Sequence, residues 1–355
     1  MFKENLENVP EYISGTKNDK YIIRLSSNEN NYGPSPRVIK KIKELSMVSF
    51  KYPDSSYKLT KEVIAKENNV SPSNIILGNG SDEIFLNLFL IYLTPRDSIV
   101  TIEKTFTYYK IVSSIIGAEV IEVKRDKDFS ISCSNIINSI KKSTKIIIFP
   151  SPDNPTGVIV DKKCIENILR NIRENTIFIL DEAYFQFVPK EKYWNSIDLI
   201  EKYPNFIVTR TFSKLYGLAG LRIGYGICQE GVTKLYEKMR MPFNLSLMAS
   251  ECSREALLDK EYYNVVLSKI IDNREKLKRM LKKLDLDVLE ESYGNFVFLQ
   301  GPTDLDKKLS EFGIVIRNLL SFGYSENFYR ITVGTEKENK ILVKALKNIL
   351  GGKCD

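Results

Sequence analysis

Residues 206–226 read FIVTRTFSKLYGLAGLRIGYG, which joins two short apolar runs through a segment that contains a lysine. The first run, FIVTRT, is typical of a strand that is buried on both faces. Lys214 follows it directly, at the end of the strand where parallel α/β sheets bind their ligands. The lysine is therefore either an ordinary surface charge or an amine kept in an apolar pocket for chemistry.

Apolar runs of the same kind recur along residues 74–227. They are NIILG, SIVTIE, AEVIEV, KIIIFP, TIFILD, FIVTRT and LRIGYGI, and amphipathic helical patterns such as GSDEIFLNLFLIYL and CIENILRNIREN lie between them. Apolar strands that alternate with helices are typical of a mostly parallel sheet with helices on both faces. The sequence therefore predicts an α/β fold built on a seven-stranded sheet.

The pattern changes after Pro242. A long charged helix is predicted over residues 261–284, and short strands, a short helix and a closing helix follow it. This order is typical of a smaller α+β domain. We therefore expect an arm at 1–27 that docks on the rest of the protein, a large domain at 28–241 and a small domain at 242–355.

Composition argues against several classes of partner. The net charge is +7 over 355 residues, and the lysines alternate with glutamates and apolar residues in helical segments, so no nucleic-acid partner is expected. The longest apolar run has about ten residues, too few to span a membrane, so no membrane partner is expected either. Five widely spaced cysteines without a C-x-x-C motif favour reduced thiols in a cytoplasmic protein.

The chain contains no histidine. This absence excludes a Ser-His-Asp or Cys-His catalytic arrangement, and it makes a zinc site improbable, so no metal is expected. Proton transfer near neutral pH must then use a carboxylate, a tyrosine, a cysteine or a lysine of lowered pKa. The absence of histidine therefore favours the interpretation of Lys214 as an amine kept for chemistry.

Three further segments fall at predicted strand ends: LGNGSDEIF at 77–85, FPSPDNPTG at 149–157 and FILDEAYFQF at 178–187. The first offers free backbone amides at a helix start, which suit a phosphate, although such glycine-rich turns are also common structure. The second, taken alone, is typical of a tight turn. The third carries an aspartate into a strand-end cleft, but a nucleotide triphosphatase is excluded because no G-x-x-x-x-G-K-[ST] motif exists.

The order and spacing of these segments are far more specific than any one of them. Asn154 of NPTG is followed after 27 residues by Asp181 of D-x-A-Y, after 33 more by Lys214, and after eight more by Arg222. In this pattern the chain resembles the fold-type-I pyridoxal-phosphate transferases, which are similar to aspartate aminotransferase, and most closely the histidinol-phosphate aminotransferases. The resemblance extends from EYISGTK and LSSNENNYGPSP to YRITVGTEKEN, nearly the whole chain.

This resemblance implies pyridoxal 5'-phosphate as the cofactor, with Lys214 as the Schiff-base lysine that also moves the proton. Asp181 would pair with the protonated ring nitrogen, while Tyr184 and Asn154 would hydrogen-bond the phenolate oxygen of the ring. Phe106 matches the family's aromatic residue that stacks on the ring. The positions that match the phosphate-binding set are Gly80, Ser81, Asp82, Thr211, Ser213 and Arg222.

The resemblance also implies a homodimer and a set of substrate-binding residues. Tyr52 in KYPD matches a tyrosine that reaches the phosphate from the partner subunit, and the arm at 1–27 would pack on the small domain and on that subunit. Arg330 in YRITVG matches the arginine that binds a carboxylate, and Arg317 would assist with a phosphate. Tyr12 and Asn28 match pocket positions of the N-terminal segment.

The implied activity is amino transfer between histidinol phosphate and 2-oxoglutarate, with glutamate as the product amino acid, in histidine biosynthesis. Alternatives remain open: a threonine-phosphate decarboxylase of cobalamin biosynthesis, a transaminase of aromatic amino acids or natural products, and a non-catalytic sensor of the same fold. The chain also departs from the family pattern at three places. It lacks a proline before Thr105, and it carries Asn31 where proline is usual and Asp153 where asparagine is usual.

Overall fold

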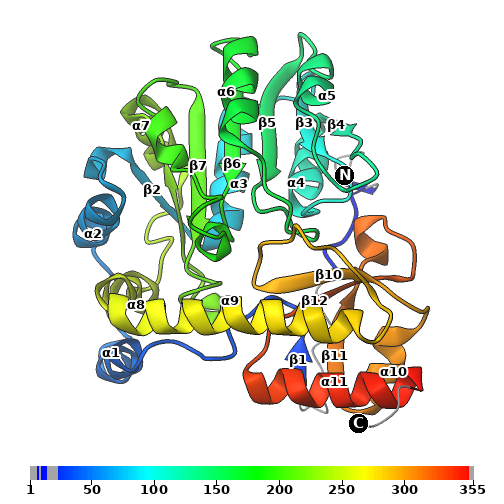
Figure 1. Ribbon diagram of the computed structural model, residues 1–355. Coiled ribbons are helices and arrows are strands. Elements are labelled where there is room, and N and C mark those ends of the chain that lie inside the picture. The colour runs from blue at the N-terminus through cyan, green and yellow to red at the C-terminus, as the bar shows by residue number, and fades with distance from the viewer. Residues whose placement is uncertain (1–5, 8, 14–22, 352–355) are drawn as a thin grey trace.

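The computed structural model describes residues 6–7, 9–13 and 23–351, which form two sheets and the helices around them (Figure 1). The larger sheet has seven strands in the order β2-β8-β7-β6-β5-β3-β4. Its strands are β2 (Ile75–Gly78), β3 (Ser98–Ile102), β4 (Glu119–Val123), β5 (Thr144–Pro150), β6 (Ile177–Asp181), β7 (Phe206–Thr211) and β8 (Gly224–Ile227). All neighbours pair in parallel except β8, which is antiparallel to both β2 and β7.

Both faces of this sheet are covered, because almost every residue of its central strands is buried. In β5, Ile146 and Ile148 join one cluster, whereas Ile147 and Phe149 join another. The first cluster holds side chains of α3 (Gly80–Tyr92), α4 (Tyr108–Ile116) and α7 (Glu230–Met239), and the second those of α2 (Lys58–Asn68), α5 (Cys133–Asn138) and α6 (Lys162–Asn171). The predicted α/β fold, with a mostly parallel seven-stranded sheet and helices on both faces, is confirmed.

The smaller sheet has five strands in the order β1-β11-β12-β10-β9. They are β1 (Ile23–Leu25), β9 (Asp287–Val288), β10 (Phe296–Gln300), β11 (Ile314–Asn318) and β12 (Phe328–Thr332). Only β1 pairs in parallel, with β11, so a strand from the start of the chain completes a sheet made by its end. α10 (Leu305–Glu311) and α11 (Glu336–Leu350) belong to this part, and the domain boundaries at 27/28 and 241/242 stay predictions.

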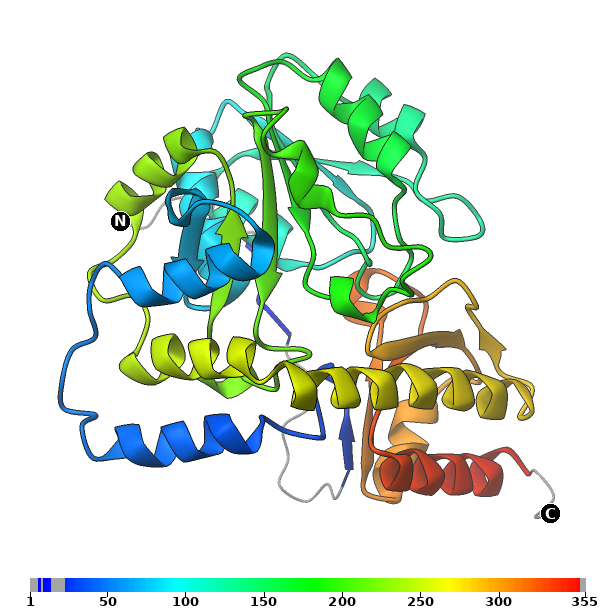
Figure 2. The same ribbon diagram turned by 60° about the vertical axis from the view of Figure 1, so that its left-hand side comes forward.

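Packed helices connect the two sheets. α8 (Leu247–Leu258) packs against α1 (Pro36–Ser46) and α2, and the long α9 (Lys260–Lys282) runs from there to the five-stranded sheet (Figures 1 and 2). In the part of the chain that the structure describes, no helix is both long enough and apolar enough to span a membrane.

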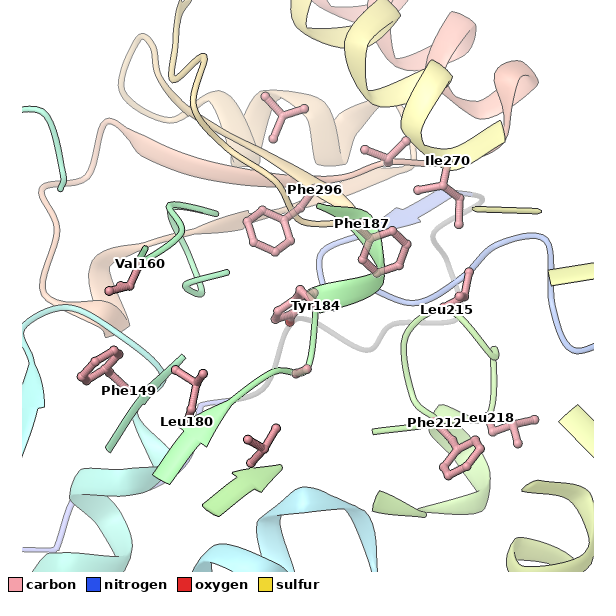
Figure 3. Packing of buried hydrophobic residues seen from close by; sticks show 14 of the residues in the cluster. Phe149, Val160, Leu180, Tyr184, Phe187, Phe212, Leu215, Leu218, Ile270 and Phe296 are labelled. Carbon is pink, nitrogen blue, oxygen red and sulfur yellow. The ribbon is translucent and has the colours of Figure 1, made fainter. Parts of the chain in front are cut away.

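The fully buried Arg274 of α9 ties the two sheets together. Its Nη1 donates to the carbonyl oxygen of Phe187 at 2.9 Å and to that of Gly294 at 3.1 Å. Phe187 follows β6, whereas Gly294 precedes β10 of the smaller sheet. Close by, the ring of Tyr184 meets that of Phe296 edge-on, with centroids 5.1 Å apart (Figure 3).

Two cysteines differ from expectation. Cys133 on α5 and Cys164 on α6 form a disulfide, with their Cα atoms 5.5 Å apart, so the expectation of reduced thiols is wrong for this pair. Cys228 and Cys252 are free and buried. Cys354 lies outside the described residues.

Candidate active site

A cavity of about 650 Å³ opens where β5, β6 and β7 end. The three strands end at Pro150, Asp181 and Thr211, and because they are parallel these ends meet at one edge of the sheet. All but two of the expected site residues line the cavity: Tyr12, Asn28, Ser81, Asp82, Phe106, Asn154, Asp181, Tyr184, Thr211, Ser213, Lys214, Arg222, Arg317 and Arg330. Residues far apart in the sequence therefore meet at one site.

The start of α3 and Arg222 form one end of the cavity. Gly80 has φ +73°, and a Cβ atom there would lie 2.4 Å from Nη2 of Arg222, so only glycine fits. Gly80 does not itself line the cavity, but it allows the arginine to lie against the helix start. Arg222 also forms an ion pair with Asp82 at 3.0 Å. Free amides at a helix N-terminus beside a guanidinium are well suited to bind a phosphate.

Asp181 lies at the base of the cavity with only 4% of its surface exposed. Its Oδ2 accepts from the Tyr109 hydroxyl at 2.6 Å, and its Oδ1 accepts from the Ala183 amide at 3.1 Å and from Thr209 Oγ1 at 3.5 Å. Burial raises the pKa of Asp181 to about 6 despite these donors. A cationic group bound in the cavity would stabilise the charged form.

Lys214 is half-buried and extends into the same cavity. Its Nζ donates to the carbonyl oxygen of Ser27 at 3.2 Å and lies 5.6 Å from the ring centroid of Tyr184. No carboxylate in the described residues forms an ion pair with this amine. Lys214 is therefore an amine held in the cavity and not an ordinary surface charge.

Two amide side chains orient the groups around the lysine. Asn28 donates from Nδ2 to the hydroxyl oxygen of Tyr184 at 2.9 Å, so the tyrosine keeps its own proton for another acceptor. Arg330 donates from Nη1 to Oδ1 of Asn154, which directs the Nδ2 hydrogens of Asn154 elsewhere. Both the tyrosine and the asparagine thus retain donors for an oxygen bound in the cavity.

Two arginines lie at the other end of the cavity. Arg330 is buried, which lowers its pKa to about 10, and it also donates to the carbonyl oxygen of Ser26 at 2.6 Å. Its Nε has no partner among the described residues. Arg317 donates from Nη2 to the carbonyl oxygen of Ile13 at 2.6 Å, and both guanidinium groups lie within 6 Å of the Phe322 ring centroid. A buried arginine with a free donor is well suited to bind an anion.

Tyr52 is the one expected site residue that lies away from the cavity. It is 80% exposed, and its ring stacks on Phe243 with centroids 4.5 Å apart. It does not line the cavity of its own chain, and its expected role from a partner subunit stays a prediction.

Sequence reasoning missed several residues of the site. Tyr109 binds Asp181, the Ser27 carbonyl holds Lys214, and Tyr108 and Phe322 line the cavity. The sequence offered no signal for the roles of these residues.

The unusual Asp153 also gains an explanation. It is fully buried and forms an ion pair with Arg125 at 2.8 Å, while Thr105 Oγ1 donates to it at 2.6 Å. Because Thr105 precedes Phe106 and Asp153 precedes Asn154, this carboxylate joins the two loops that carry those side chains into the cavity.

The architecture of this chain matches that of a solved aminotransferase structure. The crystal structure of histidinol-phosphate aminotransferase from Sinorhizobium meliloti in complex with pyridoxal-5'-phosphate superposes with a TM-score of 0.90 at 25% identity, covering 99% of this chain and 97% of that one. The fold is thus that of an aminotransferase. Residues 20–346 match the family described as aminotransferase class I and II.

Curated relatives extend the match over nearly the whole chain. Histidinol-phosphate aminotransferase from Moorella thermoacetica is 33% identical over 335 residues, covering 93% of this chain and 86% of that protein. The protein of the same name from Brevibacillus brevis is 34% identical over 363 residues, covering 99% and 98%. The chain therefore belongs to the class I and II aminotransferase family, as its sequence motifs indicate.

The raised pKa of Asp181 predicts a pH-dependent stability in the ligand-free protein. An unfolded aspartate ionises near pH 4, whereas the folded one ionises at about 6, so this residue's contribution to folding is lost as the pH rises from about 4 to about 6. Asp181→Asn does not titrate. Between pH 4 and 7 the wild type should therefore lose up to about 3 kcal/mol of its free energy of unfolding relative to the variant. Denaturant unfolding across this range measures the difference, and a difference independent of pH would contradict the prediction.

Proposed function

We propose that this chain is a pyridoxal-phosphate-dependent aminotransferase that moves an amino group between histidinol phosphate and 2-oxoglutarate. The observation that carries the proposal is a single cavity with a lysine amine and a buried carboxylate at its centre, a phosphate-binding end and two arginines opposite. The relatives named histidinol-phosphate aminotransferase, at 33% and 34% identity, support the same substrate.

The cavity residues fit pyridoxal 5'-phosphate. Gly80 leaves space that a Cβ atom would fill, so the α3 amides and Arg222 together can surround the phosphate. The donors that Tyr184 and Asn154 retain suit the phenolate oxygen of the ring, and the buried Asp181 suits its nitrogen. Ser81, Asp82, Thr211 and Ser213 complete the proposed phosphate site, and Phe106 would cover the ring.

When bound, this cofactor supplies an aldehyde for the substrate amine and a ring that withdraws electrons from the substrate α-carbon. The protein's residues then control proton positions. Lys214 would take the proton from the α-carbon and return it, which suits an amine that forms no ion pair with a carboxylate of the described residues. Asp181 would keep the ring nitrogen protonated, and Tyr184 would donate to the phenolate oxygen.

The two arginines match the two substrates. Glutamate presents a carboxylate and histidinol phosphate presents a phosphate dianion, and a planar guanidinium binds either with two parallel hydrogen bonds. Arg330, with its unpartnered Nε, would bind both anions. Arg317, together with Tyr12 and Asn28 in the pocket wall, would add contacts that favour the phosphate.

The nearest rival is decarboxylation of threonine phosphate, which would use the same arginine pair but break a different bond at the α-carbon. A parallel assay distinguishes the activities: purified protein is offered histidinol phosphate, threonine phosphate, phenylalanine and tyrosine, and both amino transfer to 2-oxoglutarate and release of carbon dioxide are measured. We expect amino transfer to be fastest from histidinol phosphate. Carbon dioxide from threonine phosphate as the main product would refute the proposal.

Arginine-to-lysine substitutions test the substrate assignment. Lysine keeps the charge but loses the two-pronged geometry, and one charge-assisted hydrogen bond is worth about 1.5–3 kcal/mol, or roughly tenfold to a hundredfold in affinity. Arg317→Lys should therefore weaken the binding of histidinol phosphate far more than that of glutamate, whereas Arg330→Lys should weaken the binding of both. Single-turnover spectra of each half-reaction measure the two affinities. If Arg317→Lys affects both substrates equally, or neither, its phosphate role is wrong.

We also infer a homodimer in which Tyr52 serves the partner's site. Tyr52, Met47 and Phe50 are each 80% exposed, and Met241 is 65% exposed. The stacking of Tyr52 on Phe243 brings the two segments that carry them together. A concentrated group of exposed apolar side chains is typical of an interface.

Mixed dimers test this arrangement. A Lys214→Ala subunit paired with a Tyr52→Phe subunit contains one doubly altered site and one unaltered site if Tyr52 acts across the interface. Activity should therefore return to about half of the wild-type value per mixed dimer, far above either parent. If Tyr52 acted within its own subunit, mixing would restore nothing, and a fully active monomer would also end the idea.

A further inference from the structure

The hydroxyl of Tyr109 makes the shortest contact to Asp181, although the mechanism above does not use it. Tyr109 lies in the first turn of α4, is fully buried, and donates to Oδ2 at 2.6 Å. Its ring is held edge-on between Phe85 and Phe106, at centroid distances of 5.2 and 5.4 Å. The phenol therefore reaches the carboxylate from a rigid position.

The other contacts to Asp181 leave this bond a distinct role. The Ala183 amide and Thr209 Oγ1 both bind Oδ1, so Tyr109 is the one donor to Oδ2 in the described part of the chain. No lysine or arginine there forms an ion pair with Asp181. Burial raises the pKa of Tyr109, so the phenol stays protonated and acts as the donor.

We propose that Tyr109 is a positioning residue that keeps the Asp181 carboxylate ionised and directed at the pyridine nitrogen of the cofactor. This inference rests on the proposed function. It assigns to α4 a role in the electronic properties of the site, in addition to its role in covering the sheet.

The electrostatics around the carboxylate agree with this role. Burial and the nearby charge of Asp82 on α3 raise the pKa of Asp181, whereas the hydrogen bonds from Tyr109, the Ala183 amide and Thr209 lower it. Without the phenol, the carboxylate would bind a proton more readily and would hold the protonated ring nitrogen less strongly.

A pair of ligands isolates the contact with the nitrogen. Pyridoxal 5'-phosphate and its 1-deaza analogue, in which a carbon replaces the ring nitrogen, share the aldehyde and the phosphate. The ratio of their dissociation constants therefore reports only what the protein gains from the nitrogen. We expect the wild-type chain to prefer pyridoxal phosphate, Asp181→Asn to lose the preference, and Tyr109→Phe to reduce it by about tenfold, the effect of one charge-assisted hydrogen bond.

Tyr236→Phe is the matched control. Tyr236 is also fully buried, and its hydroxyl donates to the carbonyl oxygen of Leu77 at 3.0 Å, so this variant loses one buried hydroxyl without touching Asp181. Its ratio should remain that of the wild type even if its affinity for both compounds falls. A Tyr109→Phe ratio equal to that of the wild type would overturn the inference.

Thr209→Val provides a second variant in case Tyr109→Phe does not fold. It removes the longer hydrogen bond at the opposite oxygen, so most of the preference should remain. A loss as complete as in Asp181→Asn would mean that Tyr109 does not hold the carboxylate. Equal binding of both compounds by the wild-type chain would overturn the proposed function itself, and this inference with it.

Discussion

Asp181 is a carboxylate buried at the centre of a sheet edge. Burial of such a charge destabilises the fold unless hydrogen-bond donors and a cation stabilise it. The protein supplies the donors from three places: α4, β7 and the turn after β6. These elements must therefore keep fixed positions around the end of β6. No cationic side chain of the described residues pairs with Asp181. Its charge is therefore balanced only when a cationic ligand is bound.

Other polar groups of the cavity also have hydrogen-bonding capacity that the described part of the chain leaves unused. Arg330 is buried with an unpartnered Nε, and Tyr184 and Asn154 each have one polar atom engaged and a donor left over. The contact between Arg330 and Asn154 also crosses from the five-stranded sheet to the seven-stranded one. The substrate end and the cofactor end are thus one hydrogen-bonded unit, and both sheets determine its geometry.

The sequence predicted some features because they leave a periodic or spaced signal. The seven apolar runs became the seven strands, and the spacing from Asn154 to Arg222 identified residues that share a cavity. Other features depend on side-chain directions that no pattern records. Two adjacent tyrosines in KTFTYY gave no indication that Tyr109 faces Asp181 and Tyr108 the cavity. Likewise, nothing near Asn28 indicated that its amide would bind Tyr184, or that Cys133 and Cys164 would pair.

The Arg125–Asp153 pair restricts how this chain can diverge. Both side chains are almost entirely enclosed, with 3% and 0% of their surface exposed, so a substitution of either alone leaves an enclosed charge without its counter-ion. An uncharged residue at 153 is therefore compatible with this enclosed position only together with a change at 125, or at a cost in stability. Each of the two residues thus limits which side chains the other position can accept.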